Sequence, residues 1–248
     1  LMRTQALYIP AKIWRPLEAP HWPTLGNFAR LGVPAALSIL VEITSFTLMA
    51  LFIARMGTAA AGAHQIAANV TALMYMVPLS LAIAISARTS YWRGAGDEQR
   101  ARRVALRGLS TAVLLAAALS IIVLLCRSWI VPVYTDNPRV AWIALGLLGW
   151  VSMYHVADAA QTISIFVLRS YRITFAPLLV YCSLLWGVGL WGGFRLAYQG
   201  FGSLEASQSP SAFWMCAACA LVLAAICFVV MLSRVTKTAV NRALNATT

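Results

Sequence analysis

Six long apolar stretches, separated by short polar segments, dominate the pattern of hydrophobic and polar positions along the chain. They cover residues 32–54, 60–91, 105–125, 140–168, 174–198 and 211–232. Each is long enough to cross a hydrocarbon core of about 30 Å as an α-helix, which takes about 20 residues. The alternation typical of strands is absent from these stretches, and lipid offers no partner to open backbone. The predicted fold class is therefore an all-α polytopic membrane protein with six transmembrane helices.

The composition supports this interpretation. Hydrophobic residues make up 61% of the chain and charged residues 10%, whereas a soluble domain carries about 25% charged residues. The net charge of +12 would suggest nucleic acid in a soluble protein. Here the cations lie between the apolar stretches, and no aromatic–basic recognition pattern accompanies them. We expect the lipid bilayer as a partner, and no nucleic acid.

The distribution of Lys and Arg predicts how the helices are oriented. With residues 1–30 placed on the cytoplasmic side, fifteen of the 19 Lys and Arg residues fall in cytoplasmic segments. Cytoplasmic loops are enriched in these residues, so we predict that both ends of this chain are cytoplasmic. Residues 1–30 then form a cytoplasmic segment, residues 31–235 the six-helix region and residues 236–248 a cytoplasmic tail.

Two of the connections carry turn signals. In the first, Gly94 and Gly96 favour a turn, and the acidic pair that follows, Asp97 and Glu98, favours the start of a helix because acids complement the helix dipole there. In the second, Asn137-Pro138 is typical of a turn between two helices.

Only two acidic residues lie well inside the apolar stretches, Glu42 and Asp158. A charge at the centre of a membrane helix costs about 2.5–3.5 kcal/mol on insertion scales, so such a residue is a functional-site hypothesis. Glu42 lies 12 residues from Arg30 and Asp158 lies 11 residues from Arg169. At about 1.5 Å per residue, both acids lie about 16–18 Å from the cytoplasmic edge. Equal depth favours one shared cavity, whereas a protonated Glu42 packed between helices is the structural alternative.

Side chains that carry oxygen accompany both acids. Tyr154, Asp158 and Gln161 share one helical face at positions i, i+4 and i+7. Ser45 lies three residues after Glu42. A carboxylate in this setting could exchange H⁺, or bind a hard cation such as Na⁺ through oxygen ligands. Both chemistries suit ion-coupled transport, with Na⁺ at Glu42 and Asp158 as the candidate metal site.

A second polar run opens the second apolar stretch, at His64, Gln65 and Asn69. A single histidine such as His64 is more typical of helix packing than of a ligand. Gln65 and Asn69 are spaced i, i+4 and could hydrogen-bond between helices, which contributes about 0.6 kcal/mol.

The cysteines give no sign of a cofactor. Cys216-x-x-Cys219 has redox or zinc spacing, but no second pair and no histidine follows it. We interpret both as small apolar helix residues, and expect no cofactor beyond the coupling ion.

Three stretches resemble the second half of bacterial multidrug and toxic compound extrusion (MATE) transporters of the NorM type. They are residues 31–70, 76–97 and 154–172. The intramembrane Glu, the His-Gln-x-Ala-x-Asn run and the Tyr-x-x-x-Asp run occur in the family's order, and the resemblance extends over about residues 26–235. It implies an antiporter of a bacterial inner membrane that exports amphipathic cationic compounds in exchange for Na⁺ or H⁺. It also implies that Glu42 and Asp158 are the coupling-ion carboxylates, with Tyr154 beside them.

The resemblance further implies a two-lobed assembly. Family members have twelve spans in two six-helix lobes, and an even number of spans makes the two lobes parallel repeats. This chain is then the C-terminal lobe of a MATE-type transporter. Its expected partner is the N-terminal lobe, and residues 1–30 become the cytoplasmic inter-lobe connection. We expect the chain to be a fragment or a truncated product.

The sequence is compatible with three other interpretations. A lipid-linked oligosaccharide flippase of the same superfamily would need several cations in its cavity, whereas these stretches carry acids. An intramembrane enzyme would need a nucleophile–base pair or paired aspartates within a reaction motif, and no such motif is present. A truncated membrane fragment without transport activity is the third reading. We therefore favour a transporter over an enzyme.

Overall fold

The computed structural model describes residues 20–200 and 205–245, and the elements of this part are helices and their connections. In chain order they are α1 (Trp22–Ala54), α2 (Thr58–Gly94), α3 (Glu98–Tyr134), α4 (Pro138–Ser170), α5 (Phe175–Tyr181), η1 (Cys182–Trp191), α6 (Gly192–Phe194), η2 (Arg195–Gln199) and α7 (Pro210–Asn245). The four elements from α5 to η2 run on without a break and form one helix, the fifth helix. Six helices of the described part are long and apolar enough to cross a membrane, which confirms the predicted fold class.

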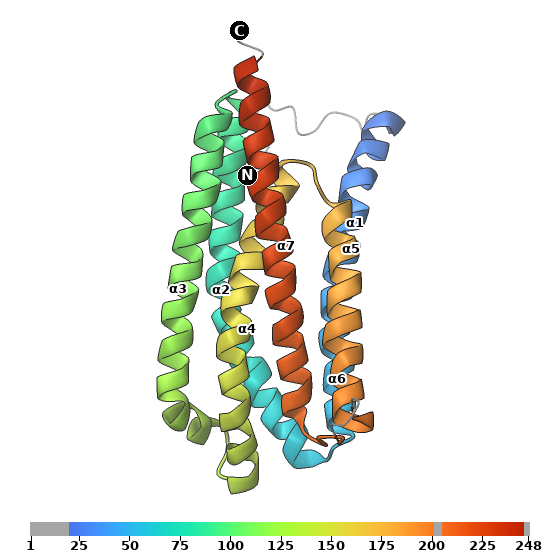
Figure 1. Cartoon of the computed structure of the whole chain (residues 1–248), viewed down its shortest axis with the longest axis vertical. Coiled ribbons are helices and arrows are strands. Elements are labelled where there is room, and N and C mark those ends of the chain that lie inside the picture. Colours follow the sequence, from blue (N-terminus) through green and yellow to red (C-terminus); the bar gives the residue numbers. More distant parts are fainter. Residues whose placement is uncertain (1–19, 201–204, 246–248) are drawn as a thin grey trace, which may run out of the picture.

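The helices form two groups that lie side by side (Figure 1). In the first group α4 packs against α2, α3 and α7, and these are the most extensive contacts between elements. In the second group α1 lies along the fifth helix. Because α4 is covered on several sides, it has more buried residues than any other described helix, and Asp158 is one of them. The central position of α4 thus determines where this acid lies.

Several helices extend past the apolar stretches that predict them. Helix α1 begins at Trp22, inside the segment 1–30, and α7 continues to Asn245, inside the segment 236–248. Hydropathy marks only the part of a helix that crosses hydrocarbon, whereas backbone hydrogen bonding continues into the interface until a cap or turn ends it. Parts of both predicted end segments are therefore helical, whereas residues 1–19 and 246–248 lie outside the described residues.

The two predicted turns have the caps that their residues favour. Gly96 has a φ of 79°, which glycine adopts without the penalty of a Cβ atom. The Asp97 side chain then accepts a hydrogen bond of 2.8 Å from the backbone N–H of Arg100 in the first turn of α3. At the other end of the bundle, Asn137 accepts backbone hydrogen bonds of 3.0 and 3.3 Å, and Pro138 begins α4.

The fifth helix departs from regular α-helical geometry. Its segments Cys182–Trp191 and Arg195–Gln199 have the wider turns of a π-helix. Glycines let this helix approach α7 closely: a Cβ atom on Gly193 would lie 2.7 Å from Phe213 Cδ1 and 3.1 Å from Phe213 Cα. The hydropathy pattern predicts the span but contains no signal for the wide turns, which often mark functional segments.

This close contact predicts that Gly193→Ala destabilises the chain. The added methyl group meets the backbone of α7 as well as a ring, so the helices must separate, and overpacking of this kind costs about 1–3 kcal/mol. We expect a lower midpoint of thermal unfolding in detergent micelles, measured by circular dichroism.

The matched control is Gly187→Ala in the same helix. A Cβ atom on Gly187 would meet nothing within 4 Å, and alanine favours a helix over glycine by about 1 kcal/mol. This variant should therefore unfold at the wild-type temperature or above. Equal midpoints for Gly193→Ala and wild type would contradict the close packing of the fifth helix on α7.

Candidate functional site

A cavity of about 560 Å³ lies between the α1–fifth helix pair and the other group of helices. Helices α1, α2, α4 and α7 and the fifth helix line it, whereas the described residues of α3 do not. Most of its walls are apolar, with Ile39, Phe46 and Leu79 among the lining residues. Its polar lining residues are Glu42, Ser45, Thr47, Thr71, Tyr75, Tyr154, Asp158, Thr162, Arg169 and Tyr181. The site is thus an apolar chamber with a small number of polar groups.

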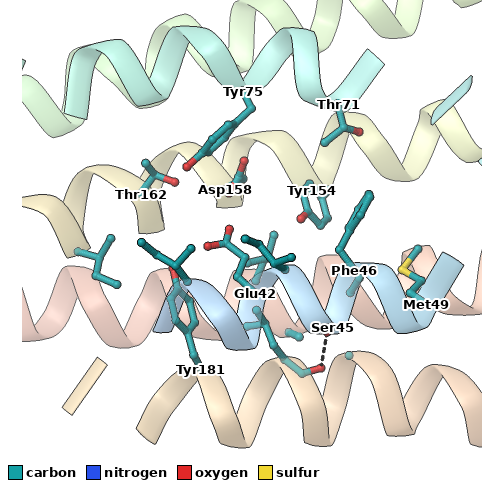
Figure 2. Close-up of a pocket in the computed structure, with 18 of the residues that line it drawn as sticks. Glu42, Ser45, Phe46, Met49, Thr71, Tyr75, Tyr154, Asp158, Thr162 and Tyr181 are labelled. Atoms are coloured by element: carbon teal, nitrogen blue, oxygen red, sulfur yellow. Dashed lines mark hydrogen bonds between the residues drawn. The ribbon is translucent and has the colours of Figure 1, made fainter. Parts of the chain in front are cut away.

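The two intramembrane carboxylates face this chamber from separate helices (Figure 2). Glu42 is carried by α1 and is half-buried, so its carboxylate reaches into the cavity. Asp158 is carried by α4 and is only 3% exposed. The structure therefore brings into one cavity the two acids for which the sequence predicts equal depth in the membrane.

Asp158 is supported by a chain of hydrogen bonds that reaches the fifth helix. Gln161 Nε2 donates to Asp158 Oδ1 at 2.8 Å, and the hydroxyl of Tyr181 donates to Gln161 Oε1. Gln161 does not line the cavity, but its amide fixes the orientation of the carboxylate that does. On the predicted polar face of α4, Tyr154 and Asp158 thus line the cavity, whereas Gln161 hydrogen-bonds to Asp158 from outside the lining.

Tyr154 lines the cavity without bonding to the acid. Its ring lies edge-on to that of Trp214, with centroids 5.7 Å apart. Among the hydrogen bonds of the described residues, none joins the Tyr154 hydroxyl to Asp158. Tyr75 and Thr162 are instead the hydroxyl side chains drawn beside Asp158 in Figure 2.

Ser45 lines the cavity and also connects two helices. Its hydroxyl donates to the backbone oxygen of Leu185 in the fifth helix at 3.3 Å. This bond is shown as the dashed line in Figure 2. Ser45 therefore holds the segment that carries Glu42 against the wide turns of the fifth helix.

The polar run of α2 does not line the cavity. His64 is buried, and its Nδ1 accepts a hydrogen bond of 3.2 Å from Trp214 Nε1, as a packing histidine would. Gln65 Nε2 donates to Asn69 Oδ1 at 3.2 Å within the same helix. In the described residues the two amides are exposed and bond to each other one turn apart, and their predicted bonding between helices stays a prediction.

Several polar residues of the cavity were not predicted from the sequence. They are Thr47, Thr71, Tyr75, Thr162, Arg169 and Tyr181. Thr162 and Arg169 follow Asp158 at i+4 and i+11, so extending the polar face of α4 toward its C-terminus would have found them. Tyr181 has no comparable signal, because its place depends on how the fifth helix packs.

The arrangement suits a cation. Two carboxylates and nearby hydroxyls provide oxygen ligands or proton acceptors. Aromatic and aliphatic walls provide apolar contact, and the volume lies within the 300–1,000 Å³ or so that small-molecule sites occupy. Both a small cation and an amphipathic one therefore find complementary groups in the same chamber.

Comparison with known proteins places the chain among transporters. Residues 34–192 match the MatE family model. A probable multidrug resistance protein NorM of Aromatoleum aromaticum is 35% identical over 221 residues, which are 89% of this chain and 48% of the relative. A multidrug resistance protein MdtK of Yersinia pseudotuberculosis is 30% identical over 218 residues, or 88% of this chain and 47% of the relative. The chain thus spans about half the length of the curated relatives that it matches.

Solved structures share the fold. The eukaryotic MATE transporter AtDTX14 aligns with a TM-score of 0.76 at 17% identity, over 98% of this chain and 54% of that one. A transporter of the MOP superfamily from Pyrococcus furiosus aligns with a TM-score of 0.67 at 16% identity, over 84% of this chain and 43% of that one. The family model covers more than half of the chain, and the chain therefore belongs to the MatE family of multidrug and toxic compound extrusion proteins, whose members are transporters and not enzymes.

Proposed function

We propose that the chain forms the C-terminal six-helix lobe of a secondary antiporter that exports cationic amphipathic compounds in exchange for Na⁺ or H⁺. In this proposal Glu42 and Asp158 carry the coupling ion. The observation that supports it is the meeting of two carboxylates, from α1 and α4, in one largely apolar cavity. The names of the relatives, which are multidrug resistance proteins, agree with drug export.

Exchange follows from competition for the same negative charges. A carboxylate in a low-dielectric site is costly unless a proton or cation compensates it. A cationic compound that enters the chamber and a coupling ion already there each provide that compensation, so the binding of one lowers the affinity for the other. Such negative coupling between two ligands is reciprocal, and an ion gradient can therefore drive the export of the compound.

The charge of the chamber favours cations over phosphate-bearing lipids. A flippase for lipid-linked oligosaccharides would need several cationic groups, whereas Arg169 is the one cation among the described lining residues and shares the cavity with two acids. The aromatic residues Phe46, Tyr75 and Tyr154 also offer faces for a cation.

The proposal includes the rest of the assembly and its location. The chain covers about half of its relatives, which suits a partner lobe of similar size. The end of the bundle that holds the α2–α3 turn is rich in arginine, which suits the cytoplasmic side. We infer a multi-pass protein of a bacterial inner membrane with both ends of this chain in the cytoplasm.

Removing either carboxylate should abolish coupled export. We expect Glu42→Gln and Asp158→Asn each to lower efflux of the fluorescent cation ethidium by at least about tenfold, since a lost charge contact of about 1.4 kcal/mol or more corresponds to that factor. Efflux is measured in cells that produce the chain alone, and in cells that produce it fused to the N-terminal half of the Aromatoleum relative.

The matched control is Glu205→Gln, which neutralises an exposed acid outside the helices. It should leave efflux unchanged at equal abundance in the membrane. Full coupled efflux by both cavity variants would contradict the assignment of Glu42 and Asp158 as carriers of the coupling ion.

The same fusion can identify the coupling ion. In everted vesicles, a pH gradient or a Na⁺ gradient imposed alone should drive ethidium movement in the wild type, depending on which ion Glu42 and Asp158 exchange. The Glu42→Gln variant should respond to neither gradient, because a neutral amide releases no ion. An undiminished response of this variant to either gradient contradicts the role of Glu42.

A further inference from the structure

A second cavity lies at the end of the bundle where α1 begins and where α4 passes into α5. Its volume is about 770 Å³, and α1, the α4–α5 connection and the start of α5 provide its walls. Figure 1 shows these two segments side by side at the upper end of the molecule. Two arginines, Arg30 from α1 and Arg172 from the connection, are the charged residues of its described lining.

The two guanidinium groups have no counter-charge in the part of the chain that the structure describes. The ion pairs found there are Arg93–Glu98 and Arg100–Asp97, and neither includes Arg30 or Arg172. Two like charges that share one cavity repel each other and create a positive potential. An anion bound between them would relieve the repulsion.

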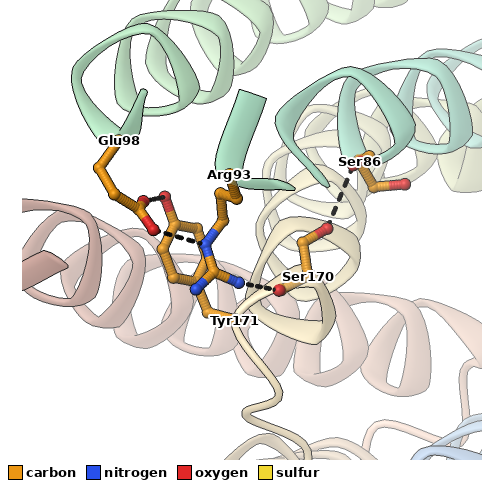
Figure 3. A network of polar contacts seen from close by, with 5 residues as sticks. All are labelled: Ser86, Arg93, Glu98, Ser170 and Tyr171. Carbon is orange, nitrogen blue, oxygen red and sulfur yellow. Dashed lines mark hydrogen bonds and ion pairs between the residues drawn. The ribbon is translucent and has the colours of Figure 1, made fainter. Parts of the chain in front are cut away.

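The backbone at Arg172 is held in an unusual conformation. Its φ is 60°, in the left-handed region that residues other than glycine rarely adopt and that costs about 1 kcal/mol or more. A polar network fixes the residues just before it (Figure 3). Arg93 pairs with Glu98 at 3.1 Å and donates to the backbone oxygen of Ser170, while the Tyr171 hydroxyl donates to Glu98 at 3.3 Å. The network therefore fixes the direction of the backbone at Arg172.

The network stays intact over the physiological pH range. Burial, together with the negative charge of Glu98, raises the pKa of Tyr171 to about 12, so its hydroxyl remains a donor. The Arg93 guanidinium lies 4.0 Å from the centroid of the Tyr171 ring, and the Ser170 hydroxyl donates to the backbone oxygen of Ser86 at 3.2 Å. The ends of α2, α3 and α4 are thus tied together beside the second cavity.

The remaining walls and surroundings are apolar and exposed. Val33 and Phe175 line the cavity and lie on the surface. On the first turns of α1, Trp22 is 76% exposed and Phe28 is 73% exposed, as expected for side chains at the boundary between membrane and water. A free phosphate ion would match the arginines only, whereas a phospholipid matches the arginines and the apolar surface together.

We propose that Arg30 and Arg172 bind the phosphate of an anionic phospholipid, whose acyl chains lie along the exposed apolar residues of the cavity. Guanidinium groups bind phosphate oxygens through paired hydrogen bonds, and basic pockets between membrane helices bind lipid headgroups. The lipid joins the start of α1, the helix that carries Glu42, to the end of α4, the helix that carries Asp158. This inference goes beyond the proposed function and does not require it.

The test uses the purified chain in detergent and native mass spectrometry. Phosphatidylglycerol is the probe, with phosphatidylcholine as the zwitterionic comparison. An arginine near a membrane surface contributes about fivefold to the binding of anionic lipid. Arg30→Gln and Arg172→Gln should therefore each weaken phosphatidylglycerol binding about fivefold, and the double variant about 25-fold, with phosphatidylcholine binding unchanged.

The matched control is Arg103→Gln, which removes an exposed arginine at the same end of the bundle but outside the cavity. It should bind phosphatidylglycerol as the wild type does, and circular dichroism should show equal helicity for all variants. Wild-type binding by the double variant, or an equal loss in Arg103→Gln, overturns the site. If inorganic phosphate binds with the same affinity as phosphatidylglycerol, the occupant of the site is not a lipid.

Discussion

A carboxylate inside a membrane protein is costly unless a donor, a proton or a cation compensates its charge, and the two intramembrane acids meet this constraint differently. Asp158 is buried on the central helix and accepts a hydrogen bond from Gln161, which Tyr181 supports in turn. Glu42 reaches into the cavity, and no hydrogen bond to its side chain is found among the described residues. Asp158 is therefore held in place by neighbouring side chains, whereas in the proposed function a mobile cation balances the charge of Glu42.

The helices around the acids connect this charge to the rest of the bundle. Ser45, one turn after Glu42, donates to Leu185 in the fifth helix, and Tyr181 of the same helix supports Gln161. The fifth helix thus contacts both acid-bearing helices through polar side chains, and it does so with wide turns and close glycine contacts to α7. The fifth helix is therefore hydrogen-bonded to the helix of each acid.

Hydropathy was sufficient to predict six helices, and the helical rise per residue placed Glu42 and Asp158 at one level, because both properties depend on position along a single helix. Which side chains form the hydrogen-bond chain at Asp158 was not predictable in the same way. Tyr154 lies one turn away in sequence yet packs on Trp214, whereas Tyr181, from another helix, completes the hydrogen-bond chain. Which neighbour bonds to a buried acid depends on how helices pack together, and a single sequence does not contain that information.

In the proposed function, a cationic substrate and the coupling ion compete for the charge of Glu42 and Asp158. Calorimetric titration of the purified protein with tetraphenylphosphonium tests it directly, in two buffers that differ in ionisation enthalpy and with Na⁺ present or absent. Binding should release protons, or should weaken as Na⁺ is added. Binding that releases no protons and does not change with Na⁺ would contradict this competition.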